Sequence, residues 1–434
     1  MGTKLDRIEE MSASNPKTVF TSLYHLINEE LLRKCHKEMD GKKATGVDSV
    51  TKAEYEENLD ANLKALVERL KKKNYKPQPS LRVYIPKGSG GKLRPIGMAA
   101  YEDKLVQSAL GRVLMAVYEP KFHNSMYGFR PNRGQHDALK ELARLVENGK
   151  TNYIVDADIK GYFNSIVHGT ALELIKFRLA DPNILWLIKK TLTAGVVEDG
   201  KWKPTDIGTE QGNLASPVIA NIYMHYALAL WYEVKFKKTC RGESGLVIYA
   251  DDFVGTFQYK EDAERFLKAV AERFAEFGLE LEQSKTRLVE FGRFAEENRK
   301  KRGEGRPETF DFLGFTHYCS KSNKTGKFRM KRKTSKKKLQ AKTKEMNNWI
   351  RRNRHLRLKD LTDMLNVKLR GHYRYYGVTD NSESMGNFYY ETQKMLFKWL
   401  NRRSQKRSYN WEEYNQLLKL FPLVRPRIYV NIYG

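Results

Sequence analysis

The order of apolar and polar residues predicts alternating helices and strands over most of the chain. Apolar residues recur at helical spacing over 58–75 and 101–122, which predicts two amphipathic helices. Residues 81–87 alternate as in a strand before the turn GSGG, and 152–159 has the apolar run of a buried strand. The pattern up to about residue 318 therefore predicts a mixed α+β region.

The pattern changes near residue 318, where strand signals fade and helical stretches over 334–353 and 389–405 predominate. From Lys321 to Asp360 the chain has 17 Lys or Arg against two acidic residues. This concentration of positive charge predicts a second, basic and helical unit with a function of its own.

The composition favours a nucleic acid as the partner. Lys and Arg number 79 and Asp and Glu 52, which gives a formal net charge of +27 over 434 residues. Such an excess makes a folded chain repel itself unless a polyanion is near, although a solvated basic surface is the alternative. The three distant cysteines form neither a disulfide framework nor a zinc pair. No segment approaches the roughly 20 apolar residues of a membrane span, so we expect a soluble intracellular protein without membrane contact.

The segment LVIYADDFV at 246–254 places two adjacent carboxylates, Asp251 and Asp252, at a turn between two strand-like runs. Like charges at this spacing raise each other's pKa, and a divalent cation would remove that cost. Mg²⁺ is commonly held by carboxylates together with phosphate oxygens. Asp156 and Asp158 lie two positions apart, on one face of another predicted strand. The combination predicts two-metal phosphoryl transfer, whereas an exposed acidic hairpin turn is the alternative for the first pair alone.

Several ordered motifs resemble a known family. YADD, DADIKGYF, EQGNLASPVIANIYMH and IPKGSGGKLRPIG look like blocks of the reverse transcriptase encoded by bacterial group II introns, also called a maturase. The resemblance runs from about residue 41 to the carboxyl terminus. It implies a right-hand polymerase with fingers, a palm with an antiparallel sheet and a helical thumb, followed by a basic helical maturase region.

The resemblance also implies domain boundaries. An amino-terminal extension and the start of the fingers take 1–80, fingers and palm 81–318, a basic helical thumb 319–378, and an RNA-binding maturase domain 379–434. The segment 20–39 is expected to be helical, and both a template clamp and a dimer surface remain open for it.

In the active site, the resemblance makes Asp158, Asp251 and Asp252 the ligands of two Mg²⁺ ions, with Asp156 a strand neighbour and not a ligand. That choice rests on Phe163, five positions after Asp158, because similar enzymes place there the aromatic ring that excludes a 2′-hydroxyl. Phe163 could equally be a core residue.

Further site residues follow from the same motifs. Lys285 matches a lysine that protonates the leaving pyrophosphate, and a surface lysine is the alternative. Lys87 and Arg94 flank the Gly-rich turn and would hold the triphosphate. Gln211 and Gly212 would contact the nucleotide and let the backbone approach the template base. Glu210 stands where proline is more common, which puts the rigidity of this loop in doubt.

RNA contacts are expected outside the catalytic centre. Arg130 and Arg133 would lie near the template path, and FDFLGF at 310–315 resembles the primer-gripping hairpin. Basic helices suit a duplex that is tracked without sequence reading. The candidate RNA-binding residues of the basic tract are Lys331, Arg332, Lys333, Lys336, Lys337 and Lys338.

Aromatic residues interleave with Arg and Lys in the last seventy residues. Tyr373, Tyr375, Tyr376 and Trp399 could stack on unpaired bases while the cations hold phosphates. Each could also belong to the domain core, and for any single one the core is the stronger interpretation.

The implied function is RNA-directed DNA synthesis by a protein that also binds group II intron RNA and assists splicing and retrohoming. Its partners would be intron RNA, an RNA template with a DNA primer, target DNA and dNTPs, in the bacterial cytoplasm and at the nucleoid. No clustered His or Cys follows the maturase region, so we expect no endonuclease domain and a primer borrowed, for example, at a replication fork. A splicing cofactor with an idle polymerase, and a polymerase of DNA repair or phage defence, are the alternatives.

Overall fold

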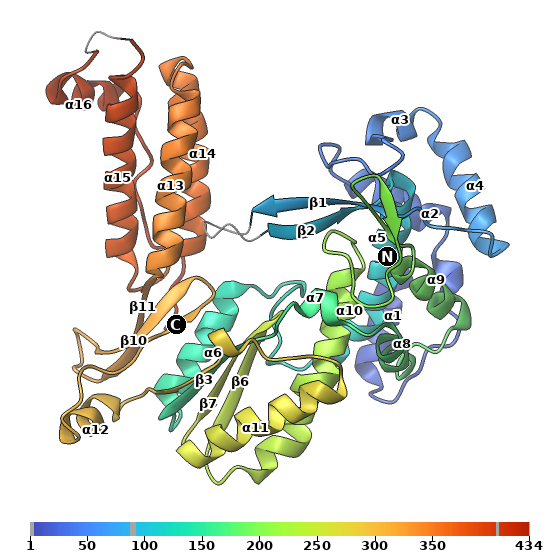
Figure 1. Cartoon of the computed structure of the whole chain (residues 1–434), viewed down its shortest axis with the longest axis horizontal. Helices are drawn as coiled ribbons and strands as arrows, with labels where there is room; N and C mark the ends of the chain where they lie inside the picture. Colours follow the sequence, from blue (N-terminus) through green and yellow to red (C-terminus); the bar gives the residue numbers. More distant parts are fainter. Residues whose placement is uncertain (1–3, 87–92, 405–407, 434) are drawn as a thin grey trace.

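The computed structural model describes residues 4–86, 93–404 and 408–433. The amino-terminal part is mainly helical around one outer sheet, the middle part holds a central sheet, and the last part is a helical bundle (Figure 1). The sequence-based expectation of mixed helices and antiparallel strands followed by a helical region is confirmed.

The outer sheet has the strand order β2-β1-β4-β5. Strands β1 and β2 are antiparallel, whereas β1 and β4 are parallel. The elements of this amino-terminal region are α1 (Lys4–Ser14), α2 (Glu29–Glu38), α3 (Lys52–Glu56), α4 (Leu59–Lys71), β1 (Ser80–Pro86), β2 (Leu93–Met98), α5 (Tyr101–Tyr118), α8 (His168–Lys176), α9 (Pro182–Leu192), β4 (Val196–Glu198), β5 (Lys201–Lys203) and α10 (Ser216–Met224).

The helix predicted over 20–39 is shorter than expected. A 3₁₀ turn spans Tyr24–Leu26, and α2 begins only at Glu29. The side chain of Asn28 accepts a hydrogen bond from the backbone N–H of Leu31, which caps the helix at its first turn. The cap therefore sets the start of α2, although apolar spacing continues upstream of it.

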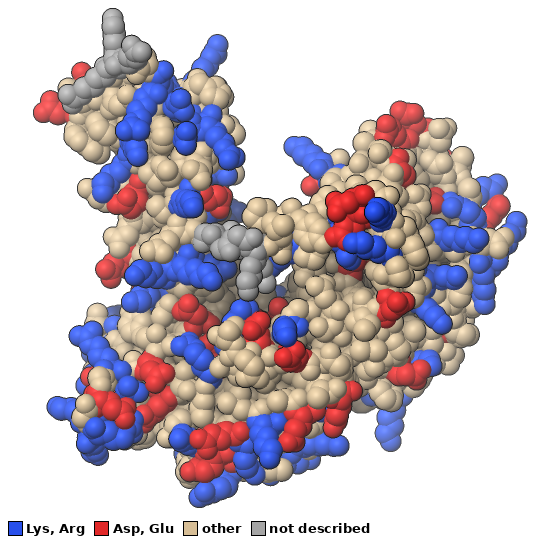
Figure 2. All heavy atoms as spheres, in the orientation of Figure 1, with Lys and Arg blue, Asp and Glu red and all other residues tan. Residues whose placement is uncertain are grey.

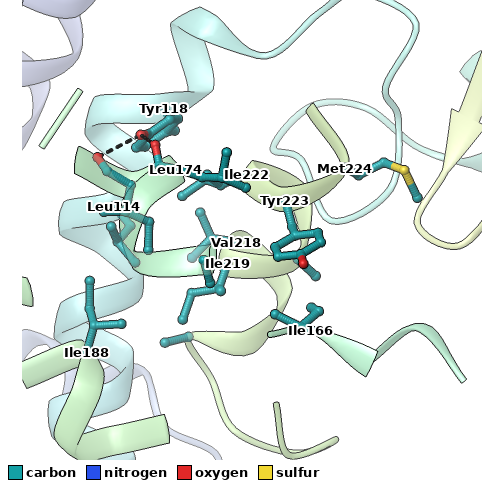
Figure 3. Close-up of a cluster of buried hydrophobic side chains, with 14 of the residues drawn as sticks. Leu114, Tyr118, Ile166, Leu174, Ile188, Val218, Ile219, Ile222, Tyr223 and Met224 are labelled. Atoms are coloured by element: carbon teal, nitrogen blue, oxygen red, sulfur yellow. Dashed lines mark hydrogen bonds between the residues drawn. The ribbon is translucent and has the colours of Figure 1, made fainter. Parts of the chain in front are cut away.

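The amino-terminal helices form one tight core. Figure 3 shows side chains of α10, including Val218, Ile219 and Ile222, between those of α5, α8 and α9. The hydroxyl of Tyr118 donates to the carbonyl of Leu174 at 3.0 Å, which ties α5 to α8. Because Val218, Ile219 and Ile222 are almost fully buried, α10 is fixed in place, and so is the loop that precedes it.

The central sheet is antiparallel, with the order β6-β7-β3-β8. Helices α6 and α11 pack on it. Val254 joins the buried cluster that includes side chains of α6, whereas its neighbour Phe253 joins the one that includes α11, as expected for alternating strand residues. The elements of this region are α6 (Gln135–Asn148), β3 (Tyr153–Asp158), α7 (Tyr162–Ser165), β6 (Ser244–Tyr249), β7 (Asp252–Phe257), α11 (Lys260–Glu276), β8 (Arg287–Glu290) and α12 (Ala295–Lys301).

A three-stranded sheet in the order β11-β10-β9 precedes the bundle. FDFLGF forms β9 and the turn into β10, so a hairpin is present at this place. The bundle rises from this sheet, as Figure 1 shows. The elements are β9 (Phe310–Phe312), β10 (Phe315–Lys321), β11 (Phe328–Thr334), α13 (Lys336–Asn353), α14 (Leu358–Tyr376), α15 (Ser382–Leu400) and α16 (Trp411–Leu420).

The expectation that strands fade after residue 318 is wrong for this hairpin. β11 has the sequence FRMKRKT and pairs with β10 along its whole length. Met330, Arg332 and Thr334 face the interior and alternate with more exposed residues. An arginine takes one of the buried positions, so the apolar alternation that marks a strand is hidden in the sequence. The segment expected as the start of a basic helical thumb therefore opens with a β-hairpin.

None of the helices in the described ranges combines the length and apolar character needed to cross a bilayer. Figure 2 shows a hollow between the upper part of the bundle and the amino-terminal region. The central sheet lies below this hollow in the same orientation.

Candidate active site

The two adjacent aspartates lie at a tight hairpin turn. β6 ends at Tyr249, β7 begins at Asp252, and these two residues are register partners. Ala250 has a positive φ of 57°, a conformation that costs a residue with a Cβ roughly 1–2 kcal/mol. Gly128 approaches the turn so closely that a Cβ there would lie 2.6 Å from the Ala250 nitrogen. Strained backbone held by close packing is typical of functional sites.

Asp158 lies opposite Asp252 across the central sheet. The two residues are register partners at the end of the β3–β7 ladder, so both side chains are on one face of the sheet, with Cβ atoms typically about 4.5–5.5 Å apart. Asp158 and Asp251 also line the same cavity, which has a volume of about 380 Å³. The fold thus brings together residues that are ninety-three positions apart in the chain.

Burial raises the pKa values of the carboxyl groups at this end of the sheet. Burial, followed by the charges of Asp251 and Asp156, raises the pKa of Asp252 to about 7, while Lys338 opposes the shift. Burial also raises the pKa of Asp156 to about 6, against the attraction of Arg287. A cation placed among these groups would offset the cost of their charges.

Lys285 supplies one positive charge at this place. It ends the 3₁₀ turn Gln283–Lys285, and its Nζ donates to the carboxylate of Asp158. In the described ranges, no three His, Cys, Asp or Glu side chains are grouped closely enough to hold a metal ion. The oxygen donors suit Mg²⁺ chemically, but they are not gathered around one point while the ammonium of Lys285 contacts Asp158. The predicted magnesium cage stays a prediction.

Predicted nucleotide contacts line the same cavity. Arg94 on β2, Phe163 on α7, and Gln211 and Gly212 before α10 all border it together with Asp158. Lys87 lies outside the described residues.

The Gln211–Gly212 loop is held against β2. The backbone N–H of Gly97 donates to the carbonyl of Gln211 at 2.8 Å. Gly212 has a φ of 122°, and a Cβ there would lie 2.3 Å from the carbonyl oxygen of Gly97. A glycine is therefore required at position 212 both by its backbone conformation and by the close approach of β2.

Glu210 also holds this loop. Its carboxylate accepts from Arg82 of β1 at 2.6 Å, and the two side chains are only 18% and 23% exposed. The sequence raised doubt about the rigidity of the loop because proline is absent. The ion pair supplies a different constraint, since it joins the loop directly to the outer sheet.

Phe163 borders the cavity and also packs against neighbouring aromatic side chains. Its ring makes edge contacts with Tyr162 and Phe129, at centroid separations of 5.7 and 6.0 Å. Phe129 also lines the cavity, although 47% of it is exposed. Of the segment MYGFRPNRG at 126–134, only Arg130 and Arg133 were predicted as site residues, and Phe129 was missed. An aromatic residue inside a Gly- and Pro-containing turn was the signal that could have found it.

Direct RNA contact by Arg130 and Arg332 is not supported. Arg130 is buried, and its guanidinium donates to both carboxylate oxygens of Glu119 and to three backbone carbonyls. Arg332 is fully buried, donates to the carbonyl of Met330 and lies over the ring of Tyr433. Both cations were expected to contact RNA, yet each side chain is buried and hydrogen-bonded inside the protein.

The remaining basic candidates are accessible. Arg133 is partly exposed and donates to Asn124. Lys331 is partly exposed as well, and the other lysines of the tract are exposed: Lys333, Lys336, Lys337 and Lys338. Lys338 lies close enough to Asp252 to lower its pKa, so the start of α13 faces the acidic end of the central sheet.

The tyrosines of α14 belong mostly to the protein interior. Tyr373 is fully buried, and Tyr375 donates to the carbonyl of Leu313. Tyr376 packs against Phe315 at 5.2 Å. Trp399 alone of the four aromatic candidates is surrounded by cations.

Two family descriptions match successive parts of the chain. Residues 85–317 match the family described as reverse transcriptase (RNA-dependent DNA polymerase). Residues 336–417 match the maturase-specific domain of the group II intron. The first segment contains the complete cavity described above, and the second corresponds to most of the bundle.

Curated relatives show the same similarity. The chain is 35% identical over 234 residues to the group II intron-encoded protein LtrA of Lactococcus lactis subsp. cremoris, covering 54% of this chain and 39% of that protein. It is 34% identical over 188 residues to protein YkfC of Escherichia coli (strain K12), covering 43% and 49%. An uncharacterized 91 kDa protein in the cob intron of Schizosaccharomyces pombe is 38% identical over 160 residues, covering 37% and 20%. The matched segments span from a fifth to about half of these relatives.

Proposed function

Since the chain belongs to the reverse transcriptase family and carries the maturase-specific domain of group II introns, we propose that it is an active RNA-directed DNA polymerase that binds intron RNA. Its antiparallel central sheet, outer sheet and helical bundle have the right-hand polymerase arrangement. The observation that carries the proposal is the cavity in which Asp158 and Asp251 face the predicted nucleotide contacts Arg94, Gln211 and Phe163.

The reaction joins a primer 3′ oxygen to the α-phosphorus of a dNTP and releases pyrophosphate. Arg94 borders the cavity and would bind the triphosphate through its planar guanidinium. Gln211 and Gly212 would hold the base and sugar against β2. Phe163 would lie against C2′ of the nucleotide and exclude a hydroxyl group there, which favours deoxynucleotides.

Asp158, Asp251 and Asp252 would hold two Mg²⁺ ions. When bound, these ions supply positive charge for the triphosphate and for the attacking and leaving oxygens. The raised pKa of Asp252 supports a cation at this place, because a positive charge would restore the ionised form. The fit requires that Lys285 release Asp158.

Lys285 would then reach the leaving group. An ammonium beside the pyrophosphate can donate a proton as the bond to the α-phosphorus breaks. Its side chain is 56% exposed, which gives it room to move from the carboxylate to the phosphates. We therefore propose one lysine with two successive contacts.

The maturase region would bind intron RNA and assist splicing and retrohoming, with target DNA, an RNA template and a DNA primer as further partners. The exposed lysines of β11 and α13 support this, and Lys338 among them lies close enough to Asp252 to lower its pKa. We place this activity in the bacterial cytoplasm and at the nucleoid. The expected absence of an endonuclease remains a prediction that a second-strand nicking assay would test.

The test is cDNA synthesis by the purified chain on poly(rA) primed with oligo(dT), with and without Mg²⁺. We expect synthesis only with the metal. The same preparation is then tested for splicing of the intron that surrounds its reading frame. Splicing assistance without synthesis would favour a cofactor with an idle polymerase, and synthesis without intron binding would favour a polymerase of repair or defence.

A further inference from the structure

The far end of the bundle holds a dense group of cations. Arg351, Arg352, Arg354 and His355 at the end of α13 line one cavity together with Arg403, just beyond α15. The cavity has a volume of about 580 Å³. Figure 2 shows Lys and Arg side chains gathered over this upper part of the bundle. We call these five residues the distal cluster.

Trp399 organises the neighbouring side chains. Arg351 and Arg354 of the distal cluster lie 5.7 Å from the centre of its ring. Lys398 and Arg402 lie at 5.4 and 5.6 Å. The indole N–H donates to the side chain of Asn347 on α13 at 2.9 Å, which fixes the ring between the two helices. Each cation is attracted to the negative face of the ring.

Carboxylates are missing from this group. Across the described ranges, no ion pair joins Asp or Glu to any of these cations, although ion pairs are frequent elsewhere on the surface. Their hydrogen bonds go to backbone carbonyls instead, from Arg354 to Arg351 and from Arg403 to Leu356. The C-terminal dipoles of α13 and α15 offset a small part of the repulsion between these cations. A polyanion would offset far more.

The ligand chemistry that fits is phosphodiester. Guanidinium groups present planar forks that match two phosphate oxygens. A base could not stack on Trp399 without displacing the cations around it, so recognition here is by the nucleic acid backbone and not by its sequence. Several Arg side chains around one cavity favour phosphates that lie close together, as in folded RNA.

The distal cluster is remote from the polymerase cavity. Lys338 at the start of α13 lies near Asp252, and Arg351 is thirteen residues further along the same helix. At a rise of 1.5 Å per residue this is about 20 Å. A ligand of the distal cluster can therefore be a different part of the nucleic acid from the primer end.

We propose that the distal cluster binds backbone phosphates of intron RNA outside the primer–template duplex, an assignment that rests on the proposed function. The bundle then has two basic surfaces with separate tasks. Lys338 at the start of α13 lies near the catalytic acids, and the distal cluster anchors the RNA that remains bound while the primer is extended.

The experiment uses the full chain with Arg351→Gln, Arg352→Gln and Arg354→Gln combined. Binding of the cognate intron RNA is measured at several salt concentrations, and oligo(dT) extension on poly(rA) is measured alongside. The control, Lys189→Gln with Lys190→Gln and Lys201→Gln, removes the same charge from exposed positions of the amino-terminal region. Thermal unfolding checks that both variants fold.

Three lost phosphate contacts should lower the slope of log affinity against log salt by about 2. We expect this change only in the distal variant, with extension within twofold of the wild-type rate. Arg→Lys at the same three positions should restore the slope but not the full affinity, because the guanidinium forks are lost. An excess of unlabelled primer–template duplex should leave RNA bound at the distal cluster.

The wild-type chain could bind intron RNA while the distal and control variants have equal slopes of log affinity against log salt. That result would contradict the role of the distal cluster as an anchor and leave the proposed function intact. Equal loss of RNA binding and of short-duplex extension in the distal variant would also overturn it. Wild-type chain that fails to bind intron RNA would overturn both the anchor and the proposed function.

Discussion

The acidic end of the central sheet and the distal cluster hold like charges in opposite ways. Asp158 is buried and Asp252 half-buried, and strand register fixes both. Arg351 and Arg352 are exposed at a helix end, with no carboxylate paired to them in the described part of the chain. The buried acids are suited to a ligand of fixed geometry, such as a metal ion. The exposed cations are suited to a ligand that needs only accumulated charge, such as an RNA backbone.

This contrast predicts different responses to mutation. Removing one buried acid breaks a geometry that the other groups depend on, so a large loss is expected from a single change. Removing one exposed cation lowers the affinity by one phosphate contact, so losses add gradually.

The largest effect is expected for Asp251→Asn. If a metal ligand is lost, several kcal/mol of transition-state stabilisation disappear, and primer extension should fall by at least about 10³-fold. Intron RNA binding should be unchanged, because the distal cluster is about 20 Å away along α13. The control is Asp156→Asn on the same sheet face, which should keep most activity. Primer extension at the wild-type rate by the Asp251→Asn variant would show that Asp251 is not part of the catalytic site.

The interior of the bundle differs from its surface because it excludes charge. His372 is buried, stacks on Phe388 at 4.0 Å, and its ring nitrogens have no hydrogen-bond partner in the described residues. Burial lowers the pKa of His372 to about 4. The unfolded chain binds the proton more tightly, so stability contributed by the neutral ring is complete above pH 6.5 and is lost as the pH falls to 4.

Between pH 6.5 and pH 4, the free energy of unfolding contributed by neutral His372 should fall by about 3 kcal/mol. Chemical unfolding of wild-type and His372→Leu chains at pH 7 and pH 4.5 measures it. Other buried groups titrate in both proteins, so the difference between the two pH dependences isolates His372. A leucine variant with the same pH dependence as wild type would show that the ring does not resist protonation.

The next effect concerns Phe163. Replacement by Ala should open the space beside C2′ and lower the preference for dNTP over rNTP by roughly 10- to 100-fold. The ratio of kcat/KM for dTTP and UTP measures this preference. Phe129→Ala is the matched control, because Phe129 contacts Phe163 but is not predicted to touch the sugar. An unchanged preference for dTTP over UTP in the Phe163→Ala variant would show that Phe163 is only a core residue.

The smallest effect is expected for Glu210→Gln. Weakening the ion pair with Arg82 should loosen the Gln211–Gly212 loop and raise KM for dNTP roughly three- to tenfold, with little change in kcat. Glu198→Gln disrupts another ion pair of the outer sheet, with Lys203, and should leave KM unchanged. Equal KM values for the two variants would show that Glu210 does not position the loop.

Much of the fold follows from local patterns. Helical spacing located α4 and α5, and the flanking apolar runs located the hairpin that holds Asp251 and Asp252. The family prediction is confirmed by the two matched domains. The pairing of Asp158 with Asp252 could not come from spacing alone, because antiparallel register between distant strands depends on the whole sheet.

The misses have a common physical cause. Arg130 and Arg332 were expected to contact RNA from the motif and the basic tract that hold them, yet each is buried with carbonyl, carboxylate or aromatic partners that the sequence does not reveal. The same buried Arg332 concealed β11. Conversely, the distal cluster lies within a region expected to bind RNA, but only the packing of α13 against α15 brings its members together around one cavity.

The most direct test of the catalytic assignment is binding of Mn²⁺, followed by electron paramagnetic resonance, to the full chain with a primed RNA template. Wild-type and Asp156→Asn chains should take up the ion, and Asp252→Asn should lose most of this binding because the carboxylate at the start of β7, opposite Asp158, is missing. Equal Mn²⁺ binding by all three chains would contradict the claim that the acids across β3 and β7 form the metal site of a polymerase.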